Sequence, residues 1–319
     1  MNEFELIRQV FMPVAVATAN PAVRLGPGDD GAIQRLPPGS ELVFSLDTLV
    51  EGVHFPADYS PRFLGWRGLA VAASDLAAMG ADPVCFTLGL TLPYSDDKWL
   101  KAFAQGLSDA AKQFGLALAG GDTTRGPLTL SFQVHGTVPA GTAILRSGAH
   151  TGDLIGVSGM LGDACAALRW LDEPSPSHHA RTLLGRYHHP EPKLTLGQLL
   201  RGTASAAVDI SDGLVADLGH ILAASGVGAR LIEAAIPRSA ALMALHGEES
   251  LAMALNGGDD YEICFTVAPD RWSSLEAAAN RGELTVIGEV TAEPGLWLSD
   301  GHQDRPVHST GYDHFGADE

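Results

Sequence analysis

The chain has few cationic side chains, and this shortage restricts what it can bind. Only four of its 319 residues are lysines, and the formal net charge is −18. Proteins that bind nucleic acids hold the phosphate backbone with clustered Lys and Arg side chains. We therefore expect no nucleic-acid partner. Ordinary solubilising surface could account for much of the acidity, so the positions of the acidic residues matter more than their number.

Cysteines and long apolar runs are also scarce. Cys85, Cys165 and Cys264 are far apart and form neither a CxxC pair nor an even disulfide framework, which favours a reducing compartment. No apolar run approaches the ~20 residues of a membrane span. Glu3 and Glu5 stand where an export signal would carry basic residues. We expect a cytoplasmic protein without a membrane partner.

The familiar lysine-based phosphate loop is missing. No GxxxxGK[ST] motif occurs, none of the lysines follows a glycine, and the HRD and DFG motifs of protein kinases are absent. A phosphate site in this chain would have to draw positive charge from metal ions and a few arginines. Arg125, beside GGDTT, and Arg146, in ILRSGA, are the arginines near glycine turns.

The hydrophobic patterns that are present predict an α/β fold. The length suits about two domains of ~100–200 residues, and we place the boundary in the small, Pro- and Gly-bearing stretch 139–152, giving domains 1–140 and 141–319. In the first domain, 3.6-residue and two-residue periodicities predict helices over 62–80 and 97–115 and strands over 84–92, 116–119 and 128–138. In the second they predict strands over 153–159, 263–267, 284–290 and 295–300, helices over 163–171, 213–225 and 270–281, and a polar loop over 172–179.

Aspartates recur where predicted strands meet glycine-rich turns or helix starts, the usual location of ligand sites in α/β folds. They occur in both domains, at Asp29, Asp30, Asp47, Asp75, Asp122, Asp209, Asp212, Asp259 and Asp260. A single such aspartate is most often a helix cap or turn former, but independent capping explains so many poorly. Carboxylates gathered without Cys or His partners favour Mg²⁺ or Mn²⁺ over zinc.

Glycine pairs beside these aspartates favour phosphate as the anion that such metals would attract, because Gly-Gly turns expose backbone N–H groups. Phosphoryl transfer suits this equipment, since it requires positioning and charge neutralisation. A non-enzymatic acidic metal-binding protein is the general alternative. The GGDDY stretch at 257–261 also resembles the GG(D/E)(D/E)F signature of diguanylate cyclases, but its upstream context does not fit those enzymes.

Seven motifs together resemble the bacterial thiamine-monophosphate kinase family in order and spacing. The resemblance spans nearly the whole chain, and the motifs are GPGDDGA, LDTLVEGVHF, SDLAAMGADP, GGDTTRGP, RSGAHTGDLIGVSG, DISDGL and GGDDYEICFT. It implies the two-domain, aminoimidazole-ribonucleotide-synthetase-like α/β fold with mixed sheets, in which the N-terminal sheet forms a homodimer. The implied reaction is ATP + thiamine monophosphate → ADP + thiamine diphosphate, by direct in-line transfer assisted by several Mg²⁺ ions.

The resemblance also implies roles for particular residues. The implied magnesium ligands are Asp30, Ser45, Leu46, Asp47, Asp75, Asp122, Asp209 and Asp212. The implied ATP contacts are Gly121, Asp122, Arg146 and Ser211, and the implied contacts to thiamine monophosphate are His54, Glu262 and Tyr312. Leu46 departs from the family, which usually carries a hydroxyl residue there, so only its backbone carbonyl could reach a metal. Taken alone, His54 is more typical of a packing residue.

Related families in the same superfamily fit less well. Selenophosphate synthetases require a reactive Cys or selenocysteine near the N-terminus, whereas the first cysteine here is Cys85 in a predicted strand. The hydrogenase-maturation dehydratases require a C-terminal cysteine, whereas this sequence ends in HFGADE. With the EGVHF and GGDDYE motifs, these differences favour the kinase over both, and over aminoimidazole-ribonucleotide synthetase.

Overall fold

A computed structural model describes residues 3–307 and divides the chain into two compact units that meet in sequence at Ala143 and Ile144. Tyr312 lies outside the described residues. We call the two parts the N-terminal unit and the C-terminal unit and describe each by itself. Both combine helices with mixed sheets, which confirms the predicted α/β class. Among the described helices, none has the length and apolar content to cross a bilayer.

The N-terminal unit is built on a four-stranded sheet in the order β3-β6-β4-β5. Strands β4 and β5 are parallel, and β6 runs antiparallel to both of its neighbours, β3 and β4. Its elements are α1 (Glu3–Leu6), the π-helical turn η1 (Ile7–Phe11), α2 (Met12–Ala17), β1 (Val23–Leu25), β2 (Ile33–Gln34), β3 (Ser40–Val50), α3 (Pro61–Ala78), β4 (Asp82–Leu92), α4 (Asp97–Phe114), β5 (Ala117–Arg125) and β6 (Thr129–Pro139).

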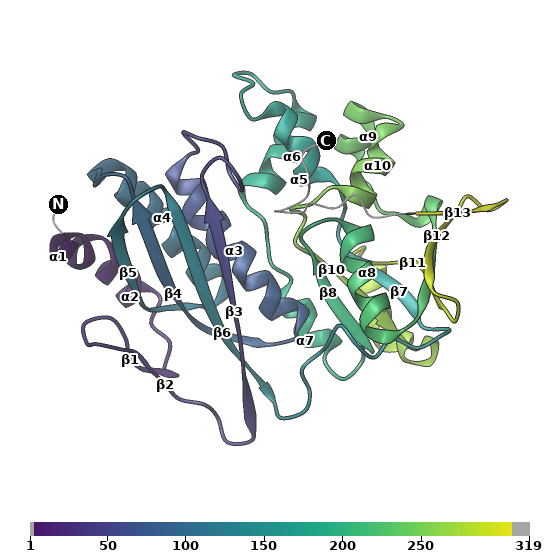
Figure 1. The fold of residues 1–319 in the computed structure, drawn as a ribbon, viewed down its shortest axis with the longest axis horizontal. Helices are drawn as coiled ribbons and strands as arrows, with labels where there is room; N and C mark the ends of the chain where they lie inside the picture. The colour runs from purple at the N-terminus through teal and green to yellow at the C-terminus, as the bar shows by residue number, and fades with distance from the viewer. Residues whose placement is uncertain (1–2, 308–319) are drawn as a thin grey trace. The chain divides into compact units, whose positions relative to one another are not determined.

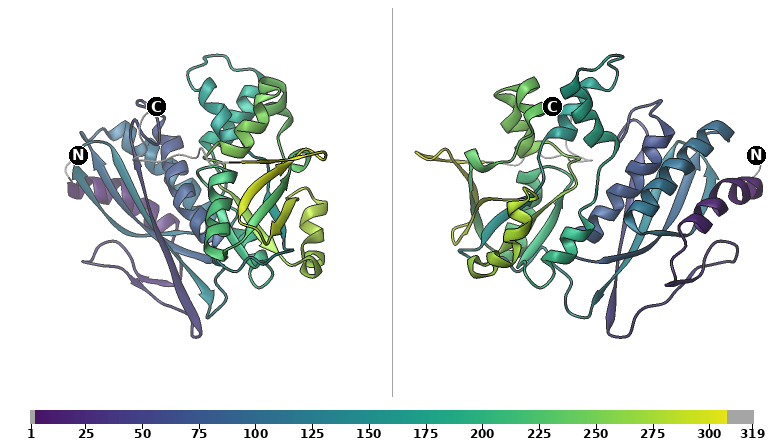
Figure 2. Two further views of the ribbon diagram at one scale, coloured as in Figure 1. Left: turned by 45° about the vertical axis from the view of Figure 1, so that its right-hand side comes forward. Right: turned by 180° about the vertical axis from the view of Figure 1, so that it is seen from behind.

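Helices α3 and α4 cover one face of this sheet (Figures 1 and 2). We call it the helix face and the opposite one the open face. Strand β6 alternates as its sequence predicts: Leu130, Phe132 and Val134 are fully buried, whereas the residues between them are partly exposed. Because side chains alternate along a strand, cross-strand register assigns each residue of the sheet to one of these two faces.

The two helices cross with their backbones in contact. A Cβ added to Gly106 would lie 1.9 Å from the Arg62 carbonyl oxygen, and one added to Gly65 would lie 2.2 Å from the carbonyl oxygen of Phe103. The predicted apolar stripe of α4 lies in this layer, where Phe103, Leu107 and other members of the stripe are buried. The helix pair therefore depends on glycine at two positions for its close approach.

The C-terminal unit is built on a seven-stranded sheet in the order β13-β12-β9-β11-β7-β10-β8. Its strands are β7 (Leu154–Ser158), β8 (Ala206–Ile210), β9 (Gly228–Ile232), β10 (Glu262–Val267), β11 (Leu284–Thr291), β12 (Gly295–Ser299) and β13 (Asp304–Pro306). Its helices are α5 (Asp163–Ala167), α6 (His178–His188), α7 (Leu194–Leu200), α8 (Leu214–Ser225), α9 (Ala240–His246), α10 (Glu249–Asn256) and α11 (Glu276–Asn280), with 3₁₀ turns η2 (Leu168–Trp170), η3 (Glu233–Ala235) and η4 (Pro269–Leu275).

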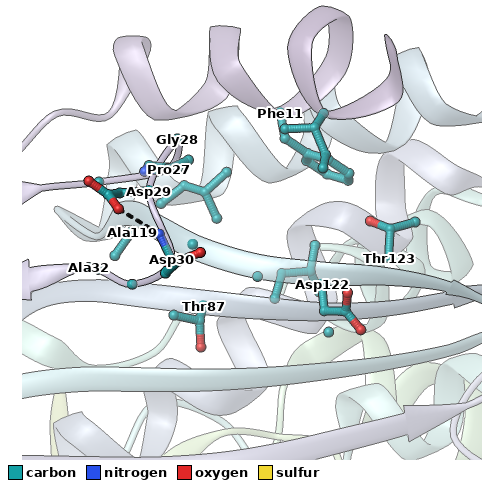
Figure 3. A pocket seen from close by; sticks show the side chains of 18 residues that line it. Phe11, Pro27, Gly28, Asp29, Asp30, Ala32, Thr87, Ala119, Asp122 and Thr123 are labelled. Carbon is teal, nitrogen blue, oxygen red and sulfur yellow. Dashed lines mark hydrogen bonds between the residues drawn. The ribbon is translucent and has the colours of Figure 1, made fainter. Parts of the chain in front are cut away.

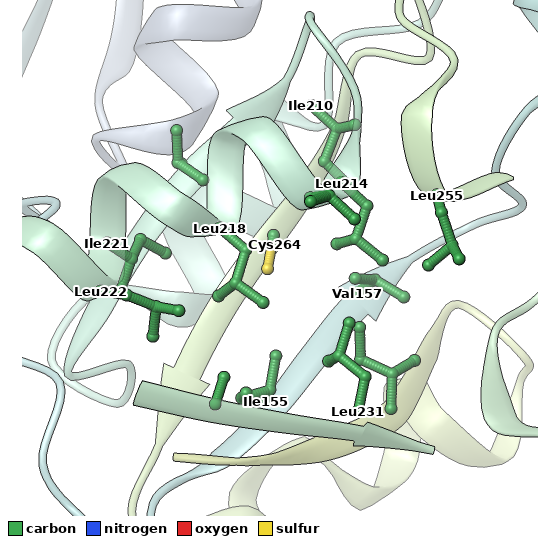
Figure 4. Packing of buried hydrophobic residues seen from close by; sticks show 14 of the residues in the cluster. Ile155, Val157, Ile210, Leu214, Leu218, Ile221, Leu222, Leu231, Leu255 and Cys264 are labelled. Atoms are coloured by element: carbon green, nitrogen blue, oxygen red, sulfur yellow. The ribbon is translucent and has the colours of Figure 1, made fainter. Parts of the chain in front are cut away.

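Helix α8 anchors the main core of this unit. Leu214, Leu218 and Ile221 project from it onto the strands, where Val157 and Cys264 complete the same buried cluster (Figure 4). On the other face of β10, Phe265 stacks on Trp272 of η4. All three cysteines of the chain are free thiols.

Several elements differ from their predictions. Strand β5 does not end at residue 119 but continues through GGDTTR to Arg125. The helix predicted over 270–281 is a 3₁₀ turn from Pro269 followed by one short α-helix, and the helix over 163–171 likewise shortens to α5 and η2. The polar loop ends at Ser177, whose hydroxyl accepts a hydrogen bond from the Ala180 amide and starts the unpredicted helix α6.

The glycine crossing yields a stability prediction. Gly106→Ala should lower the melting temperature, because overpacking typically costs about 1–3 kcal/mol and here the clash is with backbone. Gly219→Ala is the control: it also lies within a helix, but nothing lies within 4 Å of its added Cβ, so it should leave stability unchanged or raise it slightly. Thermal unfolding followed by circular dichroism compares the two variants, and equal melting temperatures would contradict the crossing.

Candidate active site

A cavity of about 890 Å³ opens in the N-terminal unit. The turn 26–32 borders it on one side and strands β4 and β5 on another, with Ile7 and Phe11 contributed by η1. Figure 3 shows Asp30, Thr87 and Asp122 around it. Its volume lies within the usual ~300–1,000 Å³ range of small-molecule sites. The structure thus brings together three predicted site residues, Asp30, Gly121 and Asp122.

Local backbone geometry shapes both walls of this cavity. In the turn, the Asp30 amide donates to Asp29 Oδ1 at 2.9 Å, which leaves the Asp30 carboxylate outside that bond. In β5, a Cβ on Gly121 would lie 2.1 Å from the carbonyl oxygen of Leu88. Only glycine allows this approach, and it is why GGDTTR continues as a strand beside β4 instead of turning away. Asp122 is therefore held on a strand.

A second group forms on the helix face. Ser45 and Asp47 lie on β3, and the Ser45 hydroxyl donates a hydrogen bond to Asp75 Oδ2 of α3. Burial, followed by the negative charge of Asp75, raises the pKa of Asp47 to about 7. Asp47 stands within β3, which continues to Val50, although the sequence predicted it at a strand end. Two carboxylates are thus held close together in a partly buried place.

These two groups lie on opposite faces of the sheet. Asp47 aligns with Phe132, whose ring meets Gly68 of α3, whereas Asp122 aligns with Gly89, whose added Cβ would face Ser131. Strands β3 and β5 are three inter-strand spacings apart, about 14 Å in all. One metal ion cannot be shared by Asp47 and Asp122 of the same copy. Across the described residues, no group of three or more His, Cys, Asp or Glu side chains could hold a metal by itself.

Leu46 and His54 occupy distinct local settings. The Leu46 side chain is 63% exposed and lies on the open face with Leu42 and Phe44, away from Ser45 and Asp47. His54 lies in the turn after β3, where its Nδ1 accepts a hydrogen bond from the Val50 amide at 3.0 Å. The ring is therefore held by the backbone of the strand that carries Asp47.

The predicted residues of the C-terminal unit gather around the end of β8. Asp209 is buried within the strand, and Ser211 and Asp212 follow in a partly exposed turn before α8. Sequence reasoning missed Asp217, whose carboxylate accepts hydrogen bonds from three amides of this turn. The available signal was its position in the first turn of a predicted helix. Arg146 is exposed in the segment before β7, where its backbone oxygen faces Ser225 Oγ.

Of the two predicted substrate contacts that the structure describes, Glu262 is the more enclosed. Its carboxylate accepts a hydrogen bond from the Ser158 hydroxyl and lies 3.1 Å from Lys193 Nζ. A Cβ on Gly159 would collide with it at 2.1 Å, so Gly159 makes room for this side chain. Lys193 was not predicted, because no motif surrounds it. The structure thus makes Glu262 part of an internal ion pair with 2% of its surface exposed.

Comparison with known proteins shows the family to which this chain belongs. Residues 28–138 match the family model "AIR synthase related protein, N-terminal domain", and residues 142–300 match its C-terminal counterpart. The thiamine-monophosphate kinase of Salmonella typhimurium is 45% identical over 99% of both chains. The crystal structure of the Stenotrophomonas maltophilia enzyme of the same name is 43% identical and superposes with a TM-score of 0.86 over 94% of this chain and 97% of that one.

A more distant solved relative carries ligands. AaThiL complexed with AMPPCP and TMP is 28% identical, with a TM-score of 0.80 over 99% of both chains. The family models cover most of this chain, and the curated relatives match it over nearly its full length. The chain belongs to the AIR synthase-related family and, within it, to the thiamine-monophosphate kinases.

Proposed function

We propose that this chain transfers the γ-phosphoryl group of ATP to thiamine monophosphate, giving ADP and thiamine diphosphate. The names of its full-length relatives support this reaction, as does the ligand pair in the structure of AaThiL complexed with AMPPCP and TMP. The observation in this chain that carries the proposal is the close pair of carboxylates, Asp47 and Asp75. Such a pair favours a divalent cation, which a kinase acting on two polyanions requires.

The side chains of this pair suit magnesium. Asp47 and Asp75 offer only oxygen atoms, and the raised pKa of Asp47 shows that nearby negative charge and burial disfavour its ionised form. A cation would remove that penalty. Mg²⁺ is usually held by one or two carboxylates plus substrate phosphates and water, so two aspartates suffice. We propose Asp30 and Asp122 as ligands at the cavity and Asp209 and Asp212 as ligands in the C-terminal unit.

We propose that the cavity of the N-terminal unit receives the nucleotide. Gly121 keeps β5 close to β4, so backbone and not a side chain forms the wall beside Asp122. The apolar residues Ile7 and Phe11 line the same space and suit a flat base. Arg146 and Ser211 are assigned to the phosphates and His54, Glu262 and Tyr312 to thiamine monophosphate, following the motifs that carry them.

The transfer itself needs little covalent help from the protein. An oxygen of the thiamine phosphate forms a bond to the γ-phosphorus while the bond to the β-bridging oxygen breaks, and ADP leaves. Phosphate monoesters have a second pKa of about 6, so the acceptor is ionised near neutral pH and no general base is required. Bound Mg²⁺ would supply the charge neutralisation that lets two polyanions meet. The role of the protein is to position them.

We propose further that a second copy of the chain covers part of the open face. Leu42, Phe44 and Leu46 project from edge strand β3 on that face and are 38%, 61% and 63% exposed. Isolated exposed apolar residues are common, but adjacent ones on one sheet face mark an interaction surface. In a two-fold symmetric homodimer the same patch of each copy faces the other, so this apolar patch would be buried against its own counterpart.

Activity should depend on the carboxylate pair. Asp47→Asn and Asp75→Asn should each reduce thiamine-phosphate-dependent ADP release by at least about a hundredfold, because metal-assisted charge stabilisation contributes several kcal/mol. Asp172→Asn, in the polar loop of the C-terminal unit, is the control. ADP release is measured with and without thiamine monophosphate and with and without Mg²⁺. Near-normal turnover in both aspartate variants would refute the assignment, and Mg²⁺-independent turnover would refute the metal.

The same pair should make the metal-free protein lose stability as the pH rises. The pKa of Asp47 is about 7 in the folded chain and near 3.8 in the unfolded chain, so the folded state binds the proton more tightly. As the pH rises from about 4 to 7, Asp47 therefore lowers the free energy of unfolding. In EDTA, the stability of Asp47→Asn relative to the natural chain should therefore increase from about pH 5 to pH 8. Denaturant titrations measure it. A difference that does not change with pH would contradict the buried, repelled carboxylate.

Dimerisation through the open face is tested by polar substitution. The double variant Phe44→Ser/Leu46→Ser should elute as a monomer in size-exclusion chromatography with light scattering, because it removes the exposed apolar surface of β3. Tyr94→Ser is the matched control: Tyr94 is 71% exposed but follows β4 outside this patch. An unchanged dimer in the double variant, or a monomeric natural chain, would disprove this interface.

A further inference from the structure

The turn between β8 and α8 is tied down through its amide groups. One oxygen of Asp217, Oδ2, accepts hydrogen bonds from the backbone amides of Ser211, Asp212 and Gly213 at 3.0, 3.0 and 3.1 Å. Three successive N–H groups that converge on one anion form the kind of concavity that binds phosphate elsewhere. Here the anion is internal. The turn is thus arranged around a carboxylate that the chain itself supplies.

The carbonyl groups of the same turn are fixed from the other side. The amide of Asp259 donates to the Ser211 oxygen, and the amide of Tyr261 donates to the Ile210 oxygen, both at 2.8 Å. Gly258 packs so closely that an added Cβ would lie 2.4 Å from the Ser211 oxygen. The GGDDY stretch therefore functions as a backbone brace for the DISDG stretch, a use that the motif itself did not reveal.

The brace carries backbone strain. Asp259 and Tyr261 adopt left-handed conformations, with φ of 72° and 50°, which are costly for residues with side chains. The Tyr261 hydroxyl donates to Asp259 Oδ1 at 2.9 Å and links the two strained residues. Such conformations persist where surrounding structure imposes them. The strained backbone of Asp259 and Tyr261 is therefore maintained by the contacts around it.

Asp217 is itself immobilised by the core. It is 2% exposed and lies in the first turn of α8, beside Leu214 and Leu218 of the main hydrophobic cluster. Gly213 cannot shift toward α10, because an added Cβ there would already be 2.7 Å from the Asn256 carbonyl carbon. A rigid helix thus transmits its position to the turn through one carboxylate.

We propose that Asp217 is a positioning residue that holds Ser211 and Asp212 in place for the nucleotide and its cation. This inference rests on the proposed function and adds to it a residue that makes no contact with either ligand. The amides of Ser211, Asp212 and Gly213 are bound to Asp217, and the carbonyls of Ile210 and Ser211 are bound to the GGDDY stretch. The backbone that carries the Asp212 side chain is therefore fixed. Removal of Asp217 would leave three amides without this acceptor and free the turn to rearrange.

Two variants and a matched control test this role. Asp217→Asn retains an acceptor oxygen but loses the charge that strengthens its hydrogen bonds, and Asp217→Ala loses both. Asp153→Asn is the control, because Asp153 is 4% exposed and accepts hydrogen bonds from the His150 amide and the Ser205 hydroxyl, yet touches neither motif. The readouts are hydrogen exchange at the amides of 211–213, the Mg²⁺ concentration at half-maximal turnover, and the melting temperature.

Positioning predicts a specific pattern. Exchange at 211–213 should accelerate in Asp217→Asn and more in Asp217→Ala, and the half-maximal Mg²⁺ concentration should rise about tenfold or more, as for other residues that orient metal ligands. Asp153→Asn should lower the melting temperature without raising the Mg²⁺ requirement.

Two outcomes would overturn the role: unchanged exchange at 211–213 in Asp217→Asn, or a fall in melting temperature with an unchanged Mg²⁺ requirement. If Asp217→Ala does not fold, Asp217→Asn decides alone. If the natural chain showed no Mg²⁺-dependent ADP release, the proposed function would fail. Hydrogen exchange at 211–213 would still show whether Asp217 fixes the turn.

Discussion

The removal of carboxylates from water is a constraint that both units of this molecule must meet. An ionised carboxylate that leaves water must find hydrogen-bond donors or an opposite charge, or else take up a proton. The C-terminal unit supplies donors from its own backbone. Asp217 accepts hydrogen bonds from three amides, and Asp260, which is partly buried, accepts one from the Gly162 amide, while desolvation raises the pKa of Asp260 well above its usual range. Both acids therefore contribute to the architecture of the unit.

The N-terminal unit treats its acids differently. Asp47 and Asp75 are brought together by a strand and a helix, and the raised pKa of Asp47 records the cost. The Ser45 hydroxyl, which donates a hydrogen bond to Asp75, links the strand and the helix at this point. A scaffold that maintains such a conflict is characteristic of sites that tune charge for a ligand. A divalent cation bound there, as we propose, would remove the conflict and would connect the packing of this unit with its chemistry.

The sequence predicted much of the fold because its signals were local. Alternation in 128–138 and the apolar stripe of 97–115 correspond directly to β6 and α4. The extension of β5 could not be predicted in this way. A glycine pair is typical of a turn, but here Gly121 permits a close approach to Leu88 of the neighbouring strand, which is a long-range contact. Pro269 similarly begins a 3₁₀ turn in place of the regular helix that periodicity indicated.

The candidate site shows the same limit at the level of side chains. The motifs predicted which aspartates hold a ligand, but they could not distinguish acids available to a ligand from acids bound to the chain's own backbone. Asp212 and Asp217 are five residues apart and chemically identical, but one leaves the turn that the other holds together. Glu262 is another example: its motif predicts a substrate contact, whereas in the structure its carboxylate is bound by Ser158 and Lys193. Tyr312 lies outside the described residues, so its assignment stays a prediction.

The two faces of the N-terminal sheet set a further condition on any mechanism. Asp47 on the helix face and Asp122 on the open face cannot share an ion within one copy, since about three strand spacings separate β3 from β5. A nucleotide in the cavity would contact cations held near Asp30 and Asp122, whereas Asp47 and Asp75 would hold another. Under the proposed function, the two groups would therefore need separate ions within one copy, because each group lies on its own face of the sheet.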